Sequence, residues 1–458
     1  MYSTEDTIFA LSTCYGKSGI AVVRISGPKS LKSVEEFGIK KKLVPRVATL
    51  AKIKDFMTGE FIDEVIVIYF PAEASYTGQD LVELHVHGSI AIINKILSHL
   101  GNSAYMRLAQ NGEFTRLALI NGRIATSKAE GLIAVMHAET ELQRQVAAKA
   151  FNGENDVVFN NLKKSVIKVL ACSEAFIDFP EDTNNEIESI DAMILSLIKL
   201  FQDIKDKINS ANMLMEGVKI ILVGDVNVGK STLMNLITDK DTSIVSDIKG
   251  TTRDIVKFKG DVSGVPVIFH DTAGIRASDD DIECQGISKT LNNLKNSQII
   301  VLILDVSKKL NGNIVSQVKS NVLKGSKIIL LLNKVDKISS KVRGVKISNI
   351  IKGIKIECSS ICQTSLLSGE GLDQFKVDLK SAALSFVSPS SNHIVISLRK
   401  QEMISSCLDL LYDALNHKVM DLKAAELNCV AGQIGLLLGR IENEEILDEL
   451  FSSFCIGK

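Results

Sequence analysis

The segment that most constrains the fold is GDVNVGKST, which runs from Gly224 to Thr232. The apolar run VKIILV (Val218 to Val223) precedes it, and KSTLMNLI follows with helical spacing of its apolar residues. The segment fits the pattern G-x-x-x-x-G-K-[ST] between a buried strand and a helix. Gly224 and Gly229 let the backbone wrap so closely that its N–H groups face phosphate oxygens. The pattern therefore predicts a phosphate-binding loop within a parallel, doubly wound sheet.

Three side chains of this loop have candidate roles with a nucleoside triphosphate. Lys230 is expected to reach the β- and γ-phosphates, and Ser231 to offer its hydroxyl to Mg²⁺. Asn227 has two interpretations. Its side-chain carbonyl could hold a monovalent cation that does the electrostatic work of an arginine finger, or it could be an ordinary turn asparagine.

Two further segments supply the metal and γ-phosphate contacts of a nucleotide hydrolase, in the expected order along the chain. HDTAG follows the apolar run VPVIFH and puts Asp271 where it can hold Mg²⁺ through its hydration shell, with Gly274 near the γ-phosphate. Between this segment and the phosphate loop lies SDIKGTTRD, in which Thr252 is the expected Mg²⁺ ligand. This order is typical of a GTPase.

The segment NKVD, Asn333 to Asp336, follows the strand-like run KIILLL and selects the base. A carboxylate at Asp336 can accept two hydrogen bonds from the N1–H and N2–H₂ edge of guanine. Adenine lacks that pair of donors, so the segment predicts GTP rather than ATP as the substrate.

Signalling-type GTPases have a glutamine directly after the glycine of the D-x-x-G motif, where it orients the attacking water. This chain has Ile275 at that place, and isoleucine cannot form a hydrogen bond. Another group must therefore position the water. The acidic candidates nearby, between which chemistry alone does not choose, are Asp279, Asp280, Asp281 and Glu283.

Composition sets outer limits on the class of protein. The chain has 458 residues, 45% of them hydrophobic and 23% charged, which is typical of a globular protein of roughly three domains. Its formal net charge of −1 means that nucleic-acid binding would need a local basic patch. The cluster Lys40, Lys41, Lys42 and Arg46 is one such group, but a solvated loop is the better interpretation of it.

Several classes are not expected. No apolar run reaches the roughly 18 residues of a membrane span, and the acidic N-terminus is unlike a secretory signal. The eight cysteines include no C-x-x-C pair, which argues against a disulfide scaffold or a zinc site. We therefore expect a cytoplasmic protein.

The chain divides into four segments of different pattern, so the fold class is multi-domain α/β plus α+β. Residues 1–120 alternate strand-like runs with turns and one helix, which predicts an α+β domain. Residues 121–215 and 379–458 have apolar stripes at helical spacing, and the two stretches could form one discontinuous all-α domain. The P-loop domain with its doubly wound sheet, 216–378, is inserted between them.

Specific segments at both ends and in the middle resemble the MnmE (TrmE) family of GTPases along the whole chain. They include DTIFALSTCYGKSGIAVVRISGP, SYTGQDLVELHVHG and GEFTRLALINGR in the first 123 residues, IDFPED in the helical region, VSDIKGTTRD, and the terminal FSSFCIGK. The resemblance implies a K⁺-stimulated GTPase that modifies C5 of the wobble uridine of tRNA with an aminomethyl or carboxymethylaminomethyl group. It implies Mg²⁺ and K⁺ as cofactors and 5-formyl- or methylene-tetrahydrofolate as the one-carbon donor. It also implies a homodimer joined to an MnmG/GidA-type, FAD-carrying partner in a heterotetramer.

The resemblance also assigns residues. Its water-orienting glutamate falls on Glu283, and its catalytic set here is Glu283, Lys230 and Cys455. Its Mg²⁺ ligands fall on Ser231 and Thr252, its K⁺ ligands on Asn227, Ser246, Ile248 and Thr251, and its folate contacts on Arg24, Glu83, Arg123 and Lys458. The predicted GTP-binding residues are Asn227, Val228, Gly229, Lys230, Ser231, Thr232, Ser246, Asp247, Ile248, Lys249, Gly250, Thr251, Thr252, Asp271, Thr272, Ala273, Gly274, Asn333, Lys334, Asp336, Ser365, Leu366 and Leu367.

Some positions depart from the family pattern. Arg123 replaces a lysine, which keeps the charge but changes its geometry, and Ala125 replaces an aspartate near the folate contacts. Val226 stands where proline is common. Without the resemblance, Glu83 would be interpreted as a half-exposed strand residue.

The role of Cys455 has three interpretations: a prenylated cysteine, a buried structural thiol, or a reactive thiol on a terminal arm. Gly457 and Lys458 do not fit a C-a-a-X box, so prenylation is the weakest of them. For the whole chain, the alternative function is a regulatory GTPase switch in ribosome assembly that modifies no base.

Overall fold

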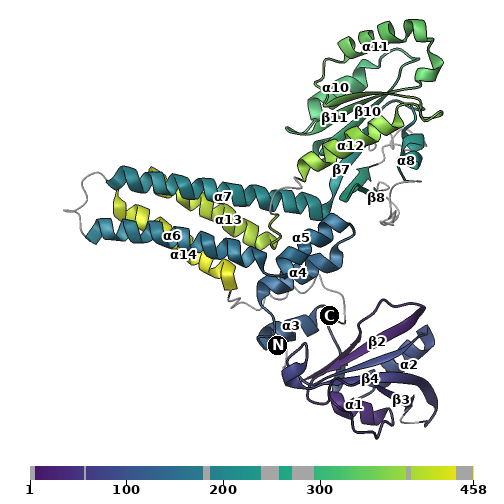
Figure 1. Ribbon diagram of the computed structural model, residues 1–458, viewed down its shortest axis with the longest axis vertical. Coiled ribbons are helices and arrows are strands. Elements are labelled where there is room, and N and C mark those ends of the chain that lie inside the picture. Colours follow the sequence, from purple (N-terminus) through teal and green to yellow (C-terminus); the bar gives the residue numbers. More distant parts are fainter. Residues whose placement is uncertain are drawn as a thin grey trace, which may run out of the picture. The chain divides into compact units, whose positions relative to one another are not determined.

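The computed structural model describes residues 6–55, 58–178, 186–238, 257–270, 293–387, 393–439 and Gly457. The chain separates into two compact units (Figure 1). The first unit contains 1–133, 150–198 and 396–458, and the second contains 134–149 and 199–395. The predicted multi-domain fold class, with α/β and α+β parts, is confirmed.

A six-stranded sheet forms the N-terminal part of the first unit, in the order β3-β4-β5-β2-β1-β6. Only the β1–β6 pair is parallel among these described strands. The strands are β1 (Thr7–Leu11), β2 (Ser18–Ser26), β3 (Thr49–Lys54), β4 (Phe61–Phe70), β5 (Leu81–Gly88) and β6 (Met106–Leu108). The short helices here are α1 (Ser30–Glu36), η1 (Ala72–Ala74), α2 (Ile90–Gly101) and α3 (Glu113–Ile120).

Helices α1 and α2 cover one face of this sheet. Alternate residues of a strand point to opposite faces, so every second strand residue packs against these helices. Val23 of β2 and Leu84 of β5 are fully buried against Ile93 and Ile96 of α2. The residues between them, such as Arg24 and Glu83, point to the other face. This opposite face is packed near β1 by Phe114 and Leu117 of α3, which are buried with Ile8 and Ala10, and it carries polar side chains such as Arg24 and Glu83 beside them.

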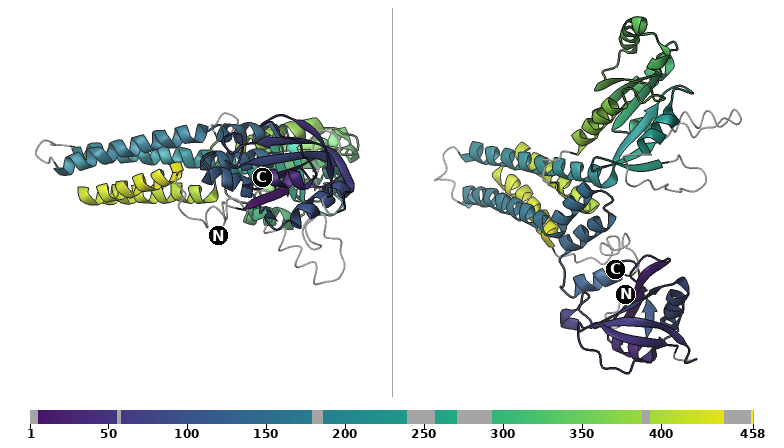
Figure 2. Two further views of the ribbon diagram at one scale, coloured as in Figure 1. Left: turned by 90° about the horizontal axis from the view of Figure 1, so that it is seen from below. Right: turned by 45° about the vertical axis from the view of Figure 1, so that its right-hand side comes forward.

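The rest of the first unit is built from helices that are distant in sequence. They are the N-terminal part of α4 (Thr126–His137), α6 (Glu154–Asp178), the N-terminal part of α7 (Glu186–Glu216), α13 (Leu398–Asn416) and α14 (Met420–Gly439). Helix α14 packs against both α6 and α13, and Figure 2 shows the yellow C-terminal helices lying beside the blue and teal ones. No described helix combines the length and apolarity that crossing a bilayer requires.

Two ion pairs join the early and late helices. Lys400 of α13 lies 2.8 Å from Glu130 of α4, and both side chains are only 8% exposed. Lys423 of α14 pairs with Asp191 of α7 and also donates to the carbonyl of Leu415. A buried charge without a partner is costly, so these pairs favour the observed packing over alternatives.

The second unit contains a six-stranded sheet in the order β12-β11-β10-β7-β9-β8, in which only the edge strand β8 is antiparallel. Its strands are β7 (Val218–Val223), β8 (Lys257–Val262), β9 (Val265–His270), β10 (Ile299–Asp305), β11 (Lys327–Asn333) and β12 (Ser360–Thr364). Its helices are α5 (Glu141–Phe151), α8 (Lys230–Thr238), α10 (Gly312–Asn321), η3 (Val335–Lys337), α11 (Ser340–Ile354) and α12 (Leu372–Phe386). The C-terminal part of α7 also belongs to this unit.

Helices cover both faces of this sheet, which explains why β10 is apolar without alternation. Val301 and Ile303 pack with Phe375 of α12, whereas Leu302 packs with Val318 of α10 and Ile347 of α11. Strands β8 and β9 lie on one side of β7, whereas β10, β11 and β12 lie on the other. The strand order therefore reverses between β7 and β10, and nucleotides bind at such a switch point in open α/β sheets.

The Glu130–Lys400 pair generates a stability prediction. Lys400→Met leaves Glu130 buried and uncompensated, so the urea unfolding midpoint should fall by the equivalent of about 3–5 kcal/mol. The double variant Glu130→Leu/Lys400→Met removes both charges and should recover most of that loss, as followed by circular dichroism. If the double variant were as unstable as the single one, packing rather than charge would explain the effect.

Candidate functional site

The phosphate-binding loop connects β7 to α8 across Gly224–Gly229, as the sequence predicts. A Cβ atom on Gly224 would lie 2.4 Å from the carbonyl oxygen of Ile303 on β10. Gly229 has φ +109°, and a Cβ atom there would lie 2.6 Å from Nδ2 of Asn333. Both glycines are therefore required by the close approach of neighbouring elements, and Gly229 also by its backbone conformation.

The charged and hydroxyl groups of the loop lie at the N-terminus of α8. Nζ of Lys230 donates to the carbonyl oxygens of Gly224 and Asp225, at 2.6 and 2.8 Å. Ser231 and Thr232 are exposed on the first turn of α8. The free N–H groups of a helix N-terminus carry partial positive charge, so this arrangement suits an anion.

Asn333 joins the loop to the rest of the carboxyl edge of the sheet. Its Nδ2 donates to the carbonyl oxygen of Val228 at 2.7 Å, and its Oδ1 accepts from the backbone N–H of Leu366 at 3.1 Å. The side chain is buried, with 3% of its surface exposed. The segment NKVD thus has a structural function, bridging the phosphate loop and the loop after β12, in addition to its predicted contact with the base.

Lys334 makes a second connection to the phosphate loop. It has a left-handed backbone conformation (φ +66°), and its Nζ donates to the carbonyl oxygen of Asn227 at 2.6 Å and to Asp305 at 2.7 Å. Burial alone would raise the pKa of the Asp305 carboxyl, but hydrogen bonds from Lys334 and Ser307 outweigh it and hold that pKa below its ordinary value. The Asp305 carboxyl therefore stays ionised at neutral pH.

Asp305 is a residue of this site that the sequence motifs do not identify. It is the last residue of β10, and it lies directly beside Asn333 in the parallel pairing of β10 with β11. A signal exists in the sequence, because an acidic residue that ends a buried strand lies at the carboxyl edge where ligands bind. Asp336, in η3, is exposed.

The loop after β12 supplies the remaining predicted nucleotide contacts that the structure describes. Ser365 is buried in a tight turn, where its backbone N–H donates to the carbonyl oxygen of Glu370 and its own carbonyl oxygen accepts from the N–H of Gly369. Leu366 is buried beneath the phosphate loop, whereas Leu367 is 92% exposed. A Cβ atom on Gly371 would lie 2.0 Å from the carbonyl of Gln363, so the turn requires glycine there.

A second cluster lies on the face of the first unit's sheet that is opposite α1 and α2. Arg24 of β2 donates to Oε1 of Glu83 on β5 through Nε and Nη2, at 3.1 and 2.7 Å. His85 lies 3.2 Å from the other oxygen of Glu83. The carbonyl oxygen of Gly457 accepts from Ser12 at 2.9 Å and from Arg24 at 3.4 Å. The structure thus joins two predicted folate contacts and brings a residue of the terminal segment beside them.

The contacts of Arg123 differ from those of Arg24 and Glu83. Its Nη2 donates to the carbonyl oxygen of Ala72 at 2.5 Å. A Cβ atom on Gly78 would lie 3.3 Å from its Nε, so the loop that contains Gly78 runs directly beside the guanidinium. Within the described residues, no contact joins Arg123 to Arg24 or Glu83.

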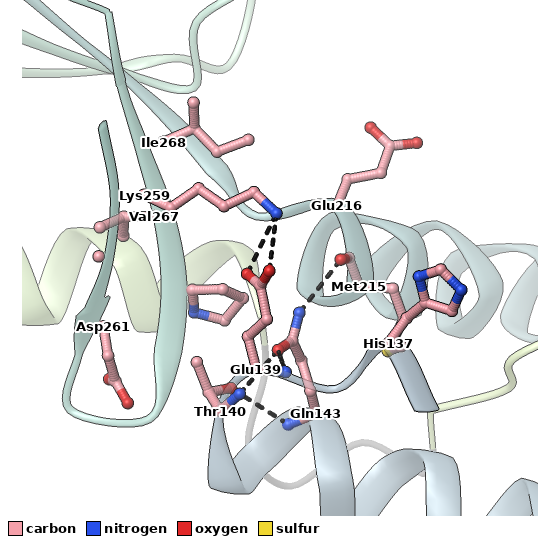
Figure 3. Close-up of a pocket in the computed structure, with 12 residues that line it drawn as sticks. His137, Glu139, Thr140, Gln143, Met215, Glu216, Lys259, Asp261, Val267 and Ile268 are labelled. Carbon is pink, nitrogen blue, oxygen red and sulfur yellow. Dashed lines mark hydrogen bonds and ion pairs between the residues drawn. The ribbon is translucent and has the colours of Figure 1, made fainter. Parts of the chain in front are cut away.

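A cavity of about 130 Å³ in the second unit contains none of the predicted site residues (Figure 3). Gln143 lies beside it, accepting from the N–H groups of Glu139 and Thr140 and donating to the carbonyls of Leu214 and Met215. It therefore caps the start of α5 and the end of α7 together. At the rim, Lys259 of β8 pairs with Glu139 at 2.9 Å. The side chains around the cavity therefore join α5, α7 and β8 to one another.

Comparison with known proteins decides the family. The family model described as "GTP-binding protein TrmE N-terminus" matches residues 7–123, and that of the "MnmE helical domain" matches 127–455. A tRNA modification GTPase MnmE from Wolbachia pipientis is 36% identical over 464 aligned residues, covering all of both chains. One from Orientia tsutsugamushi is 34% identical and covers 99% of this chain and all of its own. The chain belongs to the MnmE family.

Membership in the MnmE family confirms the predicted resemblance and the enzyme class, that of a GTPase. Among solved structures, the G domain of the T. maritima FeoB iron transporter is 22% identical and covers 36% of this chain and 98% of its own. Its TM-score is 0.27, which is too low to support any argument.

Several predicted MnmE-type residues lie outside the described part of the chain. They are Ser246, Asp247, Ile248, Lys249, Gly250, Thr251, Thr252, Asp271, Thr272, Ala273, Gly274, Glu283, Cys455 and Lys458, together with the other acidic candidates Asp279, Asp280 and Asp281. Of the predicted Mg²⁺ and K⁺ ligands, the structure therefore describes Ser231 and Asn227.

The geometry of Gly229 gives a direct test of the nucleotide site. Gly229→Ala should weaken GDP binding about 10- to 100-fold, because the new Cβ meets the Asn333 amide and the backbone is strained. Gly312→Ala is the matched control, since a Cβ there has nothing within 4 Å. Fluorescent-GDP titration measures both, and equal affinity of the two variants would contradict the assignment.

Proposed function

We propose that this MnmE-family chain is a K⁺-stimulated GTPase that, with a flavin-dependent partner, modifies C5 of the wobble uridine of tRNA. The product would carry an aminomethyl or carboxymethylaminomethyl group, and a tetrahydrofolate would donate its one-carbon unit. The observation that carries the proposal is that Asn333, in the guanine segment, bridges the phosphate loop to the loop after β12, in a chain that matches MnmE relatives along its whole length.

The described residues fit GTP and Mg²⁺. Lys230, at the mouth of the phosphate loop, would move from the loop carbonyls to the β- and γ-phosphates when these supply a stronger, charged acceptor. Ser231 would offer its exposed hydroxyl to Mg²⁺, together with Thr252 and Asp271. Asp336, which is exposed in η3, would accept from the guanine edge.

Asn227 fits the proposed role in holding K⁺. Its backbone carbonyl accepts from Lys334, and its backbone has φ +61°, a conformation that asparagine tolerates better than most residues. Within the described residues no hydrogen bond engages its exposed side-chain amide, so the carbonyl oxygen is available to a cation. Ser246, Ile248 and Thr251 would complete the ligand set, and Glu283 would orient the attacking water.

The folate proposal rests on the cluster around Arg24. A guanidinium suits the carboxylates of the glutamate tail, and the Glu83 carboxylate suits the donor edge of the pterin. The pairing of Arg24 with Glu83 holds both side chains in place before a ligand arrives. Arg123 and Lys458 would add positive charge. Cys455, two residues before Gly457, would then lie near the folate, which fits a reactive thiol at the uridine.

The homodimer proposal is supported by exposed apolar side chains on the same sheet, on the face opposite α1 and α2. Ile20, Leu50 and Ile66 are 55%, 62% and 38% exposed, and they belong to three of its strands. Such a face on an isolated domain marks an interface with another protein surface. We further propose a cytoplasmic location, the flavin-carrying partner in a heterotetramer, and domain boundaries at 1–120, 121–215, 216–378 and 379–458.

The cation mechanism predicts a salt effect on catalysis. GTP hydrolysis should be at least about tenfold faster in K⁺ than in Na⁺, because the cation neutralises charge on the transferring phosphate. Asn227→Ala should abolish the difference between the two salts, and Asn349→Ala, on the exposed face of α11, should keep it. Equal rates of the unaltered protein in K⁺ and Na⁺ would refute the mechanism.

The modification itself is tested by mass spectrometry of tRNA from cells that lack the protein. Complementation with the unaltered chain should restore the modified wobble uridine, whereas Cys455→Ser should hydrolyse GTP normally and restore none. Intact modification in the deletion strain would exclude the proposed function and favour a regulatory switch. Full modification by Cys455→Ser would return that cysteine to a structural role.

A further inference from the structure

The second unit contains a strongly basic stretch, most of which lies outside the predicted nucleotide contacts. Between Val306 and Ile356 the chain has twelve lysine or arginine residues and a single acidic residue, Asp336. The stretch therefore has a formal charge of +11 in a chain whose net charge is −1. Charge of one sign at this density is the electrostatic footprint of a polyanion-binding surface.

The structure places these cations mainly on one side of the sheet. Helices α10 and α11 both pack on the same face, through Val315 and Val318 of α10 and Ile347 and Ile354 of α11 (Figure 1). Their opposite sides are free of that packing. We call the surface formed by α10, α11 and the loops beside them the α10–α11 face. Its exposed lysines are Lys308, Lys309, Lys319, Lys324, Lys337, Lys341, Lys352 and Lys355.

These lysines are available to a ligand. Within the described part of the chain, none of the eight forms an ion pair, whereas Arg343 is held by Glu370 and Lys334 by Asp305. Lys341 and Lys352 are eleven residues apart on α11, so their Cα atoms are separated by about 16 Å along the helix axis. The charge thus extends along a helix instead of converging on a small site.

The chemistry of the face favours a nucleic-acid backbone over other polyanions. Protein interfaces are depleted in lysine and enriched in aromatic residues and arginine, yet the exposed cations here are all lysines. A membrane-surface helix needs a separate apolar side to insert, but Ile347 and Ile354 of α11 are buried in the core. The exposed apolar residues of α11, which are Val342, Val345 and Ile351, are each adjacent to a lysine in the sequence and form no apolar side of their own. Lysine ammonium groups are point charges that suit phosphates.

The stretch also indicates which part of a nucleic acid it would contact. Residues 306–356 contain no phenylalanine, tyrosine or tryptophan. Proteins that read unpaired bases stack them on aromatic side chains, and this face has none. The face is therefore suited to contact the phosphates of helical RNA and not to recognise its bases.

We propose that the α10–α11 face binds the phosphate backbone of tRNA. The choice of tRNA rests on the proposed function, since a tRNA-modifying enzyme must hold this polyanion. The surface is separate from the phosphate loop, so the tRNA and GTP would occupy different parts of the same unit.

The test compares two variants of the full-length protein with the same reduction in positive charge. The first neutralises the face with Lys319→Gln, Lys341→Gln, Lys352→Gln and Lys355→Gln. The control neutralises exposed lysines elsewhere with Lys164→Gln, Lys168→Gln, Lys199→Gln and Lys380→Gln. Binding of transcribed tRNA and of an unrelated RNA hairpin is measured by fluorescence anisotropy over a range of KCl concentrations.

The first variant should raise the Kd for both RNAs by about tenfold or more. The slope of log K against log salt should also become shallower, by roughly 0.7 to 0.9 for each phosphate that a lysine no longer neutralises. The control variant should bind like the unaltered chain. An unchanged Kd and slope for the first variant, or an equally weakened control, would overturn the proposal. The proposal would also be overturned if the four substitutions abolished binding to phosphatidylserine vesicles but left tRNA binding unchanged.

Failure of this proposal can be told apart from failure of the proposed function. GTP hydrolysis without tRNA should be the same in the first variant and the unaltered chain. Suppose that deletion of the protein left the wobble uridine modified while the first variant bound RNA more weakly than the unaltered chain. The RNA-binding role of the α10–α11 face would then be supported, and the proposed tRNA-modifying function would be excluded.

Discussion

The buried amide of Asn333 is the contact on which the nucleotide site depends. It donates to the phosphate loop and accepts from the loop after β12, so three segments far apart in sequence share one side chain. A buried amide without one of its partners costs about 1–3 kcal/mol, which is a strong constraint on the relative positions of these loops. The contact is possible because Gly229 has no Cβ atom, which would otherwise lie 2.6 Å from the amide nitrogen.

Elsewhere in the molecule, ion pairs likewise fix the relative positions of segments that are distant in sequence. Lys334 with Asp305 ties the phosphate loop to β10, Arg24 with Glu83 joins adjacent strands, and Lys400 with Glu130 joins helices 270 residues apart. In each pair a partly or fully buried charge would be costly alone, so the partner selects one arrangement. The eight lysines of the α10–α11 face differ, because solvent covers them and no ion pair within the described residues neutralises them.

Much of the fold could be predicted from local pattern. Alternation of apolar and polar residues predicted β5, and the unbroken apolar run from Ile299 to Val306 predicted β10, which is buried on both faces. The glycines, Lys230 and Ser231 predicted the strand–loop–helix element. These features depend on neighbours within a few residues, for which periodicity and backbone preference are sufficient. Asp305 could not be singled out in this way, because its importance comes from the strand beside it and not from its own segment.

The sequence by itself determined the phosphate loop, the guanine segment and the family, since each is carried by residue types at fixed short spacing. Only the tertiary structure decided that Asn333 bridges two loops, that Gly457 lies against Arg24, and that lysines from two helices share one face. The physical reason is that strand order and helix packing bring distant residues together. Such juxtapositions follow from burial of the whole apolar surface, which no short segment specifies alone.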